Sequence, residues 1–334
     1  MAYTTIKKSS EHFTPFTFTG SGSAGTRTGV GFTPDMFIHK NRDNNQGWGV
    51  IDVIRGNGNY LATNNANAEG SDVGAYGITT DGYTFPNGDA FFNGSGNNMA
   101  YWNWKAGGTG VSNTDGSITS TVSANTTSGF SIVSWTGTGA TATIGHGLGV
   151  APKMIIVKRL GSATNWTVYT TVIDGSNDYL NLNTTDPKAD SGNALPTSTV
   201  FSKNDTNAEN VIAYCFAEKQ GFSKFGSYTG NGNADGTFVY TGFKPALVIL
   251  KRTESTGTDW NLVDNKRAGY NPDNYFLAPN SSGAENSVND IVDLLSNGFK
   301  LTSASGASNA SGGSYIYMAF AEEPLVGDNP CTAR

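Results

Sequence analysis

The stretch GVAPKMIIVK, residues 149–158, sets the pattern of this chain: a glycine, a proline three residues later, an apolar run and a closing lysine. The same pattern occurs at residues 31–40 and 242–251, and the proline and the lysine are six residues apart in every copy. An unbroken apolar run with these boundaries is typical of a strand whose two faces are both buried. The three copies therefore predict three related β units in one chain.

Four further anchors accompany this strand in each copy. An aromatic residue and a Thr-Gly-x-Gly turn precede it, and a lone tryptophan, a Tyr-Leu-like strand and an aromatic closing strand follow it. The turns lie at 16–22, 135–139 and 228–232, the tryptophans are Trp48, Trp166 and Trp260, the Tyr-Leu-like strands lie at 60–61, 179–180 and 275–277, and the closing strands lie at 100–104, 212–216 and 316–320. Five anchors in one order predict an internal repeat with a period of roughly one hundred residues.

The composition indicates an all-β fold. Charged residues make up 14% of the 334-residue chain, well below the usual fraction of about 25%. The 43 glycines and the many Asn, Ser and Thr residues disfavour helices and favour short strands with tight turns. We therefore expect three tandem β-sandwich modules of jelly-roll-like type.

The repeat also predicts module boundaries. The first segment, residues 1–106, is expected to hold the first sandwich and an N-terminal segment that docks onto another protein by strand addition. Residues 107–128, rich in Gly, Ser and Thr, are expected to form a linker. The middle segment, 129–221, and the third segment, 222–334, complete the set, and the third includes a C-terminal tail.

Charge and hydropathy exclude two classes of partner. The net charge is −6 and the only basic run is Lys7-Lys8, so we expect no nucleic-acid binding, which requires a basic face. The longest apolar runs are too short for a membrane span, and no apolar segment of a secretory signal follows Lys7-Lys8. We therefore expect no membrane insertion and assembly in a cytoplasm.

Metal and cofactor motifs are absent from the sequence. Gly20–Gly25 matches G-x-G-x-x-G but lacks the following helix that a dinucleotide site needs. Cys215 and Cys331 form no CxxC pair, and the three histidines lack metal-ligand spacing. His39 occupies the position of Val157 and Leu250 in the other copies, which predicts a strand residue. We expect no metal and no cofactor.

Catalytic constellations are also absent, so we assign no catalytic residue and expect no enzyme. The scattered acids leave a glycan depolymerase open as an alternative, because paired carboxylates cleave glycosidic bonds. These acids are Asp52, Asp264, Glu218, Glu322 and Glu323. Asp52 and Asp264 each precede an arginine by three residues, which predicts a local salt bridge.

Aromatic residues provide the candidate ligand-binding residues. Neutral sugars bind through stacking on aromatic faces and hydrogen bonds to amides and hydroxyls. The three repeated tryptophans are predicted to lie in the core of their own modules. The non-repeating aromatics Trp102, Tyr83, Phe91 and Phe92 are predicted to be exposed and to bind glycan. The lysine that ends each apolar run is expected to keep its ammonium group in water.

Several of these motifs carry a resemblance to a known family. The opening residues 1–6, the stretches 31–43 and 101–107, and the segments 130–159 and 319–322 resemble repetitive, β-rich virion proteins of tailed bacteriophages. Members of that family look like tail-fibre or appendage components. The matching motifs are structural, so they carry over no active-site residue.

The resemblance implies a bacteriophage virion structural protein exposed on the particle surface. We expect a tail fibre or tail-associated host-attachment component that binds cell-surface glycan. A capsid decoration or head-fibre protein with a structural role only is the alternative. The expected partners are other virion proteins and a host surface glycan. Because fibres and shells assemble with closed symmetry, we also expect a homo-oligomer, a trimer if the protein is a fibre.

Overall fold

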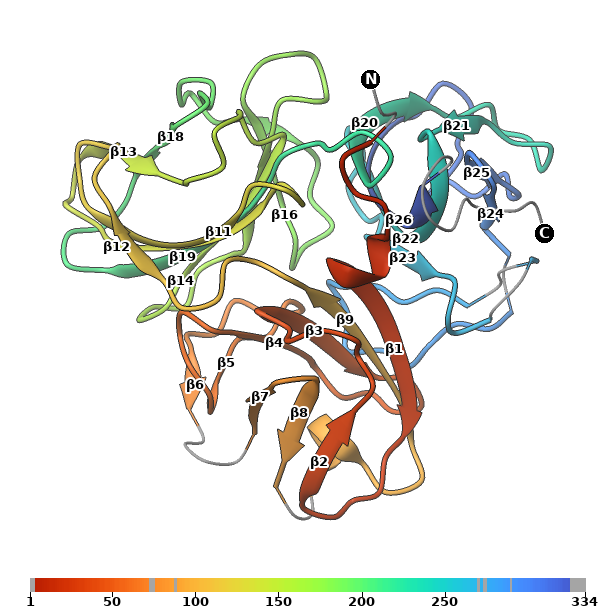
Figure 1. The fold of residues 1–334 in the computed structure, drawn as a ribbon. Coiled ribbons are helices and arrows are strands. Elements are labelled where there is room, and N and C mark those ends of the chain that lie inside the picture. The colour runs from red at the N-terminus through yellow and green to blue at the C-terminus, as the bar shows by residue number, and fades with distance from the viewer. Residues whose placement is uncertain are drawn as a thin grey trace.

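The predicted all-β fold is confirmed. A computed structural model describes residues 4–71, 76–86, 89–268, 271–272, 275–288 and 290–324, and nearly all regular structure in them is antiparallel strand. The strands form three groups around a common centre, one from each repeated segment (Figure 1). Two short helical turns, η1 (Ser9–Glu11) and α1 (Ala90–Asn93), lie in the first segment.

The first segment folds into a main sheet with a smaller sheet on its outer face. The main sheet has the order β1-β9-β3-β4 and the smaller one β2-β8-β7, and β5 pairs separately with β6. The bounds are β1 Phe13–Thr19, β2 Gly25–Thr28, β3 Met36–Asn41, β4 Trp48–Asp52, β5 Asn59–Tyr60, β6 Gly70–Ser71, β7 Gly77–Thr79, β8 Gly82–Phe85 and β9 Asn98–Trp104.

The middle segment and the residues before it form an eight-stranded sheet, β10-β11-β12-β19-β14-β15-β16-β17, and a two-stranded sheet, β13-β18. The bounds are β10 Val111–Asn113, β11 Ser120–Asn125, β12 Phe130–Thr136, β13 Thr141–Gly145, β14 Met154–Arg159, β15 Thr167–Thr170, β16 Asp178–Asn181, β17 Ala189–Asp190, β18 Val200–Asn204 and β19 Asn210–Phe216.

The third segment repeats the plan of the first, with the sheets β20-β26-β22-β23 and β21-β25-β24. The bounds are β20 Ser223–Thr229, β21 Phe238–Tyr240, β22 Phe243–Arg252, β23 Asn261–Asp264, β24 Val292–Leu295, β25 Gly298–Leu301 and β26 Ser314–Pro324. In all three segments the strand of the apolar run (β3, β14 or β22) pairs with the closing strand on one side. On the other side it pairs with the strand that begins at the repeated tryptophan or directly after it.

The stretch 107–128, expected to be a linker, contains strands β10 and β11. Strand β11 pairs with β12 from Thr121↔Ser134 to Asn125↔Phe130, and β10 pairs with β11. Val122 of β11 lies in the hydrophobic cluster between the two sheets of the middle segment. These residues therefore belong to the sheet. Their high Ser and Thr content suits a half-exposed strand as well as it suits a linker.

Alternation along the central strands separates two cores. On β14, Met154 and Ile156 face the centre of the molecule, whereas Ile155 and Val157 face the smaller sheet β13-β18. Because successive side chains on a strand point to opposite faces, the continuous apolar run fills both spaces. The inner faces of all three segments meet in one central cluster, so the segments share a core in addition to their own outer cores.

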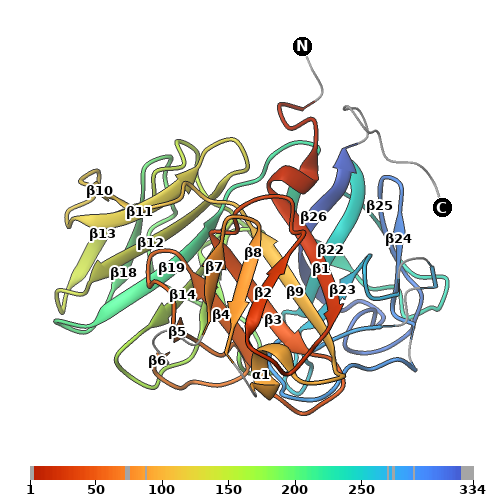
Figure 2. The ribbon, with the colours of Figure 1, turned by 60° about the horizontal axis from the view of Figure 1, so that its bottom comes forward.

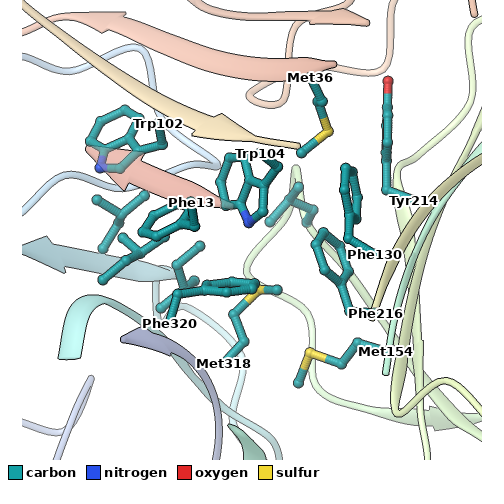
Figure 3. Packing of buried hydrophobic residues seen from close by; sticks show 14 of the residues in the cluster. Phe13, Met36, Trp102, Trp104, Phe130, Met154, Tyr214, Phe216, Met318 and Phe320 are labelled. Atoms are coloured by element: carbon teal, nitrogen blue, oxygen red, sulfur yellow. The ribbon is translucent and has the colours of Figure 1, made fainter. Parts of the chain in front are cut away.

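Three aromatic rings, one from each closing strand, meet in this shared core. Trp104 lies 5.6 Å from Phe320 and 6.4 Å from Phe216 between ring centroids, and Phe216 lies 5.8 Å from Phe320. Figure 3 shows the three rings converging from β9, β19 and β26. All three side chains are at most 2% exposed, so their burial depends on the presence of all three segments.

The repeated tryptophans are buried as predicted, but each one contacts a neighbouring segment. The indole nitrogen Nε1 of Trp166 donates to the carbonyl of Ala62 at 2.8 Å, and Nε1 of Trp260 donates to the carbonyl of Asn181 at 3.0 Å. Nε1 of Trp48 donates to the carbonyls of Ala278 and Ser281 at 3.1 and 2.9 Å. Each segment therefore covers the tryptophan of the next, and the third covers that of the first.

Three backbone hydrogen bonds follow the same cyclic order. The N–H of Glu69 donates to the carbonyl of Leu160, that of Lys188 to Thr253, and that of Glu285 to Arg42, at 2.9, 2.6 and 2.8 Å. Arg42, Leu160 and Thr253 all lie eight residues after the proline of their segment. Equivalent contacts at all three junctions close the segments into a ring, which Figure 2 shows from a second side.

The lysines that close the apolar runs are buried, contrary to the expectation that their ammonium groups remain in water. Lys40, Lys158 and Lys251 are at most 1% exposed. Loops cover the ammonium groups: Nζ of Lys158 donates to the carbonyl of Thr164 in the following loop and to that of Ala66 in the first segment. Burial lowers the pKa of each lysine to about 8.

Replacement of Trp166 by Phe is predicted to destabilise the protein, because the partly buried carbonyl of Ala62 loses its donor. A buried unpaired polar group costs about 1–3 kcal/mol. The matched control is Trp104→Phe, which removes a similar ring volume, but Nε1 of Trp104 has no hydrogen-bond partner in the described structure. Urea unfolding should give the larger loss of unfolding free energy for Trp166→Phe. Equal losses would contradict the prediction.

Candidate functional site

Three of the four aromatics predicted to bind glycan are buried. Trp102, Tyr83 and Phe92 are at most 1% exposed. The indole nitrogen of Trp102 donates to Asp264 Oδ2 at 2.9 Å across the junction between the first and third segments. The hydroxyl group of Tyr83 donates to Asn103 Oδ1, and Phe92 stacks on Tyr76. These rings cannot stack on a sugar, since they occupy inward strand or helix positions even though they do not repeat.

Phe91, the fourth predicted residue, is half-buried. It lines a surface hollow of about 600 Å³ together with Tyr60 and Asn65, on the outer side of the first segment. Gln46 and Gly47 also line this hollow. The middle segment has a groove at the corresponding place, and that groove contains two cations in addition to a carboxylate.

Two of the candidate acids lie in buried local ion pairs at the junctions between segments. Asp52 Oδ2 accepts from Arg55 Nε at 2.5 Å and from the hydroxyl group of Tyr214, in the middle segment, at 2.7 Å. Asp264 Oδ2 accepts from Arg267 Nε at 2.6 Å and from Trp102. The predicted local salt bridges are present, and each acid also holds a neighbouring segment in place.

The middle segment has Thr170 at the position of these acids. The closing strand of the third segment, which lies next to it, also differs from the other two closing strands. The closing-strand residues that bond the acids are Trp102 and Tyr214, which lie opposite Ile38 and Ile156. The third closing strand has Met318 at the same register, opposite Ile249. A methionine donates no hydrogen bond. The third junction thus lacks both the carboxylate and its donor, and the hydroxyl group of Thr170 donates to the carbonyl of Lys153 at 2.9 Å instead.

The other single candidates have structural surroundings. His39 lies in β3, as predicted, with its ring between Phe91, Phe92 and Tyr101. Cys215 is fully buried, and burial raises the pKa of its thiol. Within the described residues, no three His, Cys, Asp or Glu side chains gather as a metal site would require. No helix in that part of the chain is long and apolar enough to cross a membrane.

The best candidate site is the groove on the outer face of β14–β16. Its floor consists of Val157, Thr167, Tyr169, Tyr179 and Asn181, which point away from the shared core. The covering sheet β13-β18 has only two strands and packs over β12, β19 and β14. The faces of β15 and β16 therefore stay open, and both tyrosines are half-buried.

The wall of the groove carries three charged side chains. Lys203 of β18 and Arg159 of β14 both approach Asp205, with Oδ1 of the carboxylate 3.3 Å from Lys203 Nζ and 3.6 Å from Arg159 Nε. Asp205 Oδ2 accepts from Trp135 Nε1 at 3.1 Å, whereas Oδ1 is buried and has no hydrogen-bond donor in the described structure. Lys203 Nζ also lies 5.7 Å from the ring centroid of Tyr169.

Comparison of the three segments shows that two of the lining residues, Tyr169 and Lys203, are particular to the middle one. Tyr169 lies three residues after the repeated tryptophan, where the other segments have the fully buried Ile51 and Val263. Lys203 lies two residues after Phe201, a core residue of the outer sheet, and Leu301 holds the same place in the third segment. Two positions that hold apolar core residues in other segments therefore hold Tyr169 and Lys203 in the middle segment, where both line the open groove.

Sequence reasoning missed this site because it looked for aromatics outside the repeat. The informative signal was a repeated position whose residue type changes from apolar to polar in one copy only. Tyr169 and Lys203 both satisfy that description. Asp205 and Arg159 carry no comparable signal, since only the fold brings them together.

The family model described as "Domain of unknown function (DUF7483)" matches residues 8–324. The chain belongs to this family. No curated protein and no solved structure matches this chain.

Replacement of His39 by Leu is predicted to reduce the loss of folding stability at acidic pH. Burial lowers the pKa of His39 from 6.5 to about 3, so the unfolded chain binds a proton that the folded chain does not. Folding stability should therefore fall as the pH drops from about 6.5 toward 3. His39→Leu should flatten this slope, measured by urea unfolding at several pH values, while the values at pH 8 serve as the reference. An unchanged slope would show that His39 does not contribute.

Proposed function

We propose that this protein is a bacteriophage virion structural component, a tail fibre or tail-associated part that attaches the particle to host-cell glycan. The observation that carries the proposal is the open groove of the middle segment, with two half-buried tyrosines and amide, hydroxyl and charged groups around them. Aromatic faces beside such groups suit sugar rings. The proposal includes no catalytic role.

The remaining support comes from the sequence and the ring. The motifs resemble phage virion proteins of the tail-fibre or appendage kind, and a low charge content suits an exposed, glycine-rich β structure. The shared core and the buried tryptophans hold the groove on a continuous β framework. A site on strands keeps its side chains in fixed relative positions, which lowers the entropic cost of binding.

We also propose that the protein assembles as a homo-oligomer on the virion surface, a trimer if it is a fibre, with other virion proteins as partners. The inner faces of the segments are already buried in the shared core, so contacts between copies would use outer strands or loops. Light scattering of the purified protein should then give three times the chain mass of 35.1 kDa. A mass equal to that of one chain, even at high protein concentration, would contradict the trimer.

Attachment is tested on particles that carry this protein. Gold-labelled antibody viewed by electron microscopy should mark the tail or its fibres, and purified protein added to host cells should reduce particle adsorption. Label spread over the head, together with unchanged adsorption, would replace the proposal by the capsid decoration or head-fibre role. Reducing-end release from host polysaccharide would instead indicate a glycan depolymerase.

A further inference from the structure

We propose that the groove of the middle segment binds a saccharide that carries a carboxylate, such as a uronic acid unit. This inference rests on the proposed attachment function and specifies its ligand and its residues. The groove measures about 410 Å³, which lies within the range of about 300–1,000 Å³ found for small-ligand sites.

The charge of the groove favours an acidic ligand. Its lining includes two cations, Arg159 and Lys203, and one carboxylate, Asp205. The groove therefore carries one surplus positive charge in a chain whose net charge is −6. The side chains of Arg159 and Lys203 are 29% and 14% exposed, whereas that of Asp205 is 2% exposed. An entering ligand thus meets the cations, because the acid lies beneath them.

Asp205 serves to hold the cations in place. Trp135 fixes one carboxylate oxygen from below, and the other oxygen lies near both cations but receives no hydrogen bond. With the carboxylate held beneath them, the more exposed cations can donate to a sugar carboxylate. Charge-assisted hydrogen bonds of this kind are about twice as strong as neutral ones.

The tyrosines supply the surface for the sugar ring. The rings of Tyr169 and Tyr179 are cross-strand neighbours with centroids 6.1 Å apart and planes inclined by 48°. Asn165 and Asn181 flank them in the groove. Asn165 Oδ1 accepts from Asn183 Nδ2 at 2.9 Å, so a second amide orients it. Two aromatic rings with polar groups around them match a sugar, whose faces carry C–H groups and whose rim carries hydroxyls.

The test is calorimetric titration of the full chain with oligogalacturonate and with the fully methyl-esterified form of the same oligomer. Esterification replaces each charged carboxylate by a neutral methyl ester on the same sugar backbone, so wild-type protein should bind the acid form at least tenfold more tightly. Lys203→Met should reduce this preference to about threefold or less, and added salt should weaken the acid form selectively. Tyr169→Ala should weaken both forms.

The control variants use a similar pair elsewhere in the chain. Lys224 in the third segment lies 5.4 Å from the ring of Tyr240, so Lys224→Met and Tyr240→Ala remove the same residue types outside the groove. Both should bind like wild type. Thermal unfolding of every variant separates lost binding from lost folding, and Tyr169→Phe provides a milder change that keeps the ring.

Three outcomes would overturn the proposal. Equal affinity for both forms would exclude selection by charge, and binding that Lys203→Met and Tyr169→Ala leave unchanged would place the ligand elsewhere. No binding of either form, while the protein still blocks particle adsorption, would reject this groove and leave the attachment function standing. If the titration succeeds but adsorption is unaffected, the groove is a saccharide site and the attachment role fails.

Discussion

The contact of Trp104, Phe216 and Phe320 at the centre of the molecule is the constraint on which the other features depend. Each ring comes from a different closing strand, and none of the segments can bury its inner face alone. The apolar face of a sheet must pack against another element, and here the other two segments provide that packing. The fold is therefore best understood as a ring of three segments with a common core. The tryptophan hydrogen bonds and the backbone bonds at residues 69, 188 and 285 fix the order in which the segments meet.

This arrangement explains why polar groups at the junctions differ between segments. Two junctions contain a buried carboxylate, Asp52 or Asp264, with an arginine and an aromatic donor from the neighbouring closing strand. The third has Thr170 and Met318 at those positions. A buried carboxylate without a donor would be costly, so acceptor and donor are present together or absent together. The closing lysines follow the same rule, because carbonyl groups of nearby loops satisfy each buried ammonium group.

The ring arrangement also gives the inner and outer faces of the segments different roles. Inner faces are committed to the shared core, so the outer faces are where the segments can differ. The outer sheets of the first and third segments each have three strands, whereas the middle segment has two and leaves its tyrosines open. The charges of the groove then lie on a framework that all three segments stabilise. A change in the ligand-binding residues would leave the repeated framework intact.

The sequence by itself determined the all-β class, the repeat, the central strand of each segment and the burial of the repeated tryptophans. These follow from local alternation, turn residues and the recurrence of anchors, all of which act over short stretches of chain. It did not determine that residues 107–128 form strands, that Trp102, Tyr83 and Phe92 are buried, or that Lys40 lies out of water. Those outcomes depend on which segments cover which faces. The groove likewise joins Arg159, Tyr169 and Asp205 from separate strands and loops, and only the tertiary structure brings such distant residues within reach of one ligand.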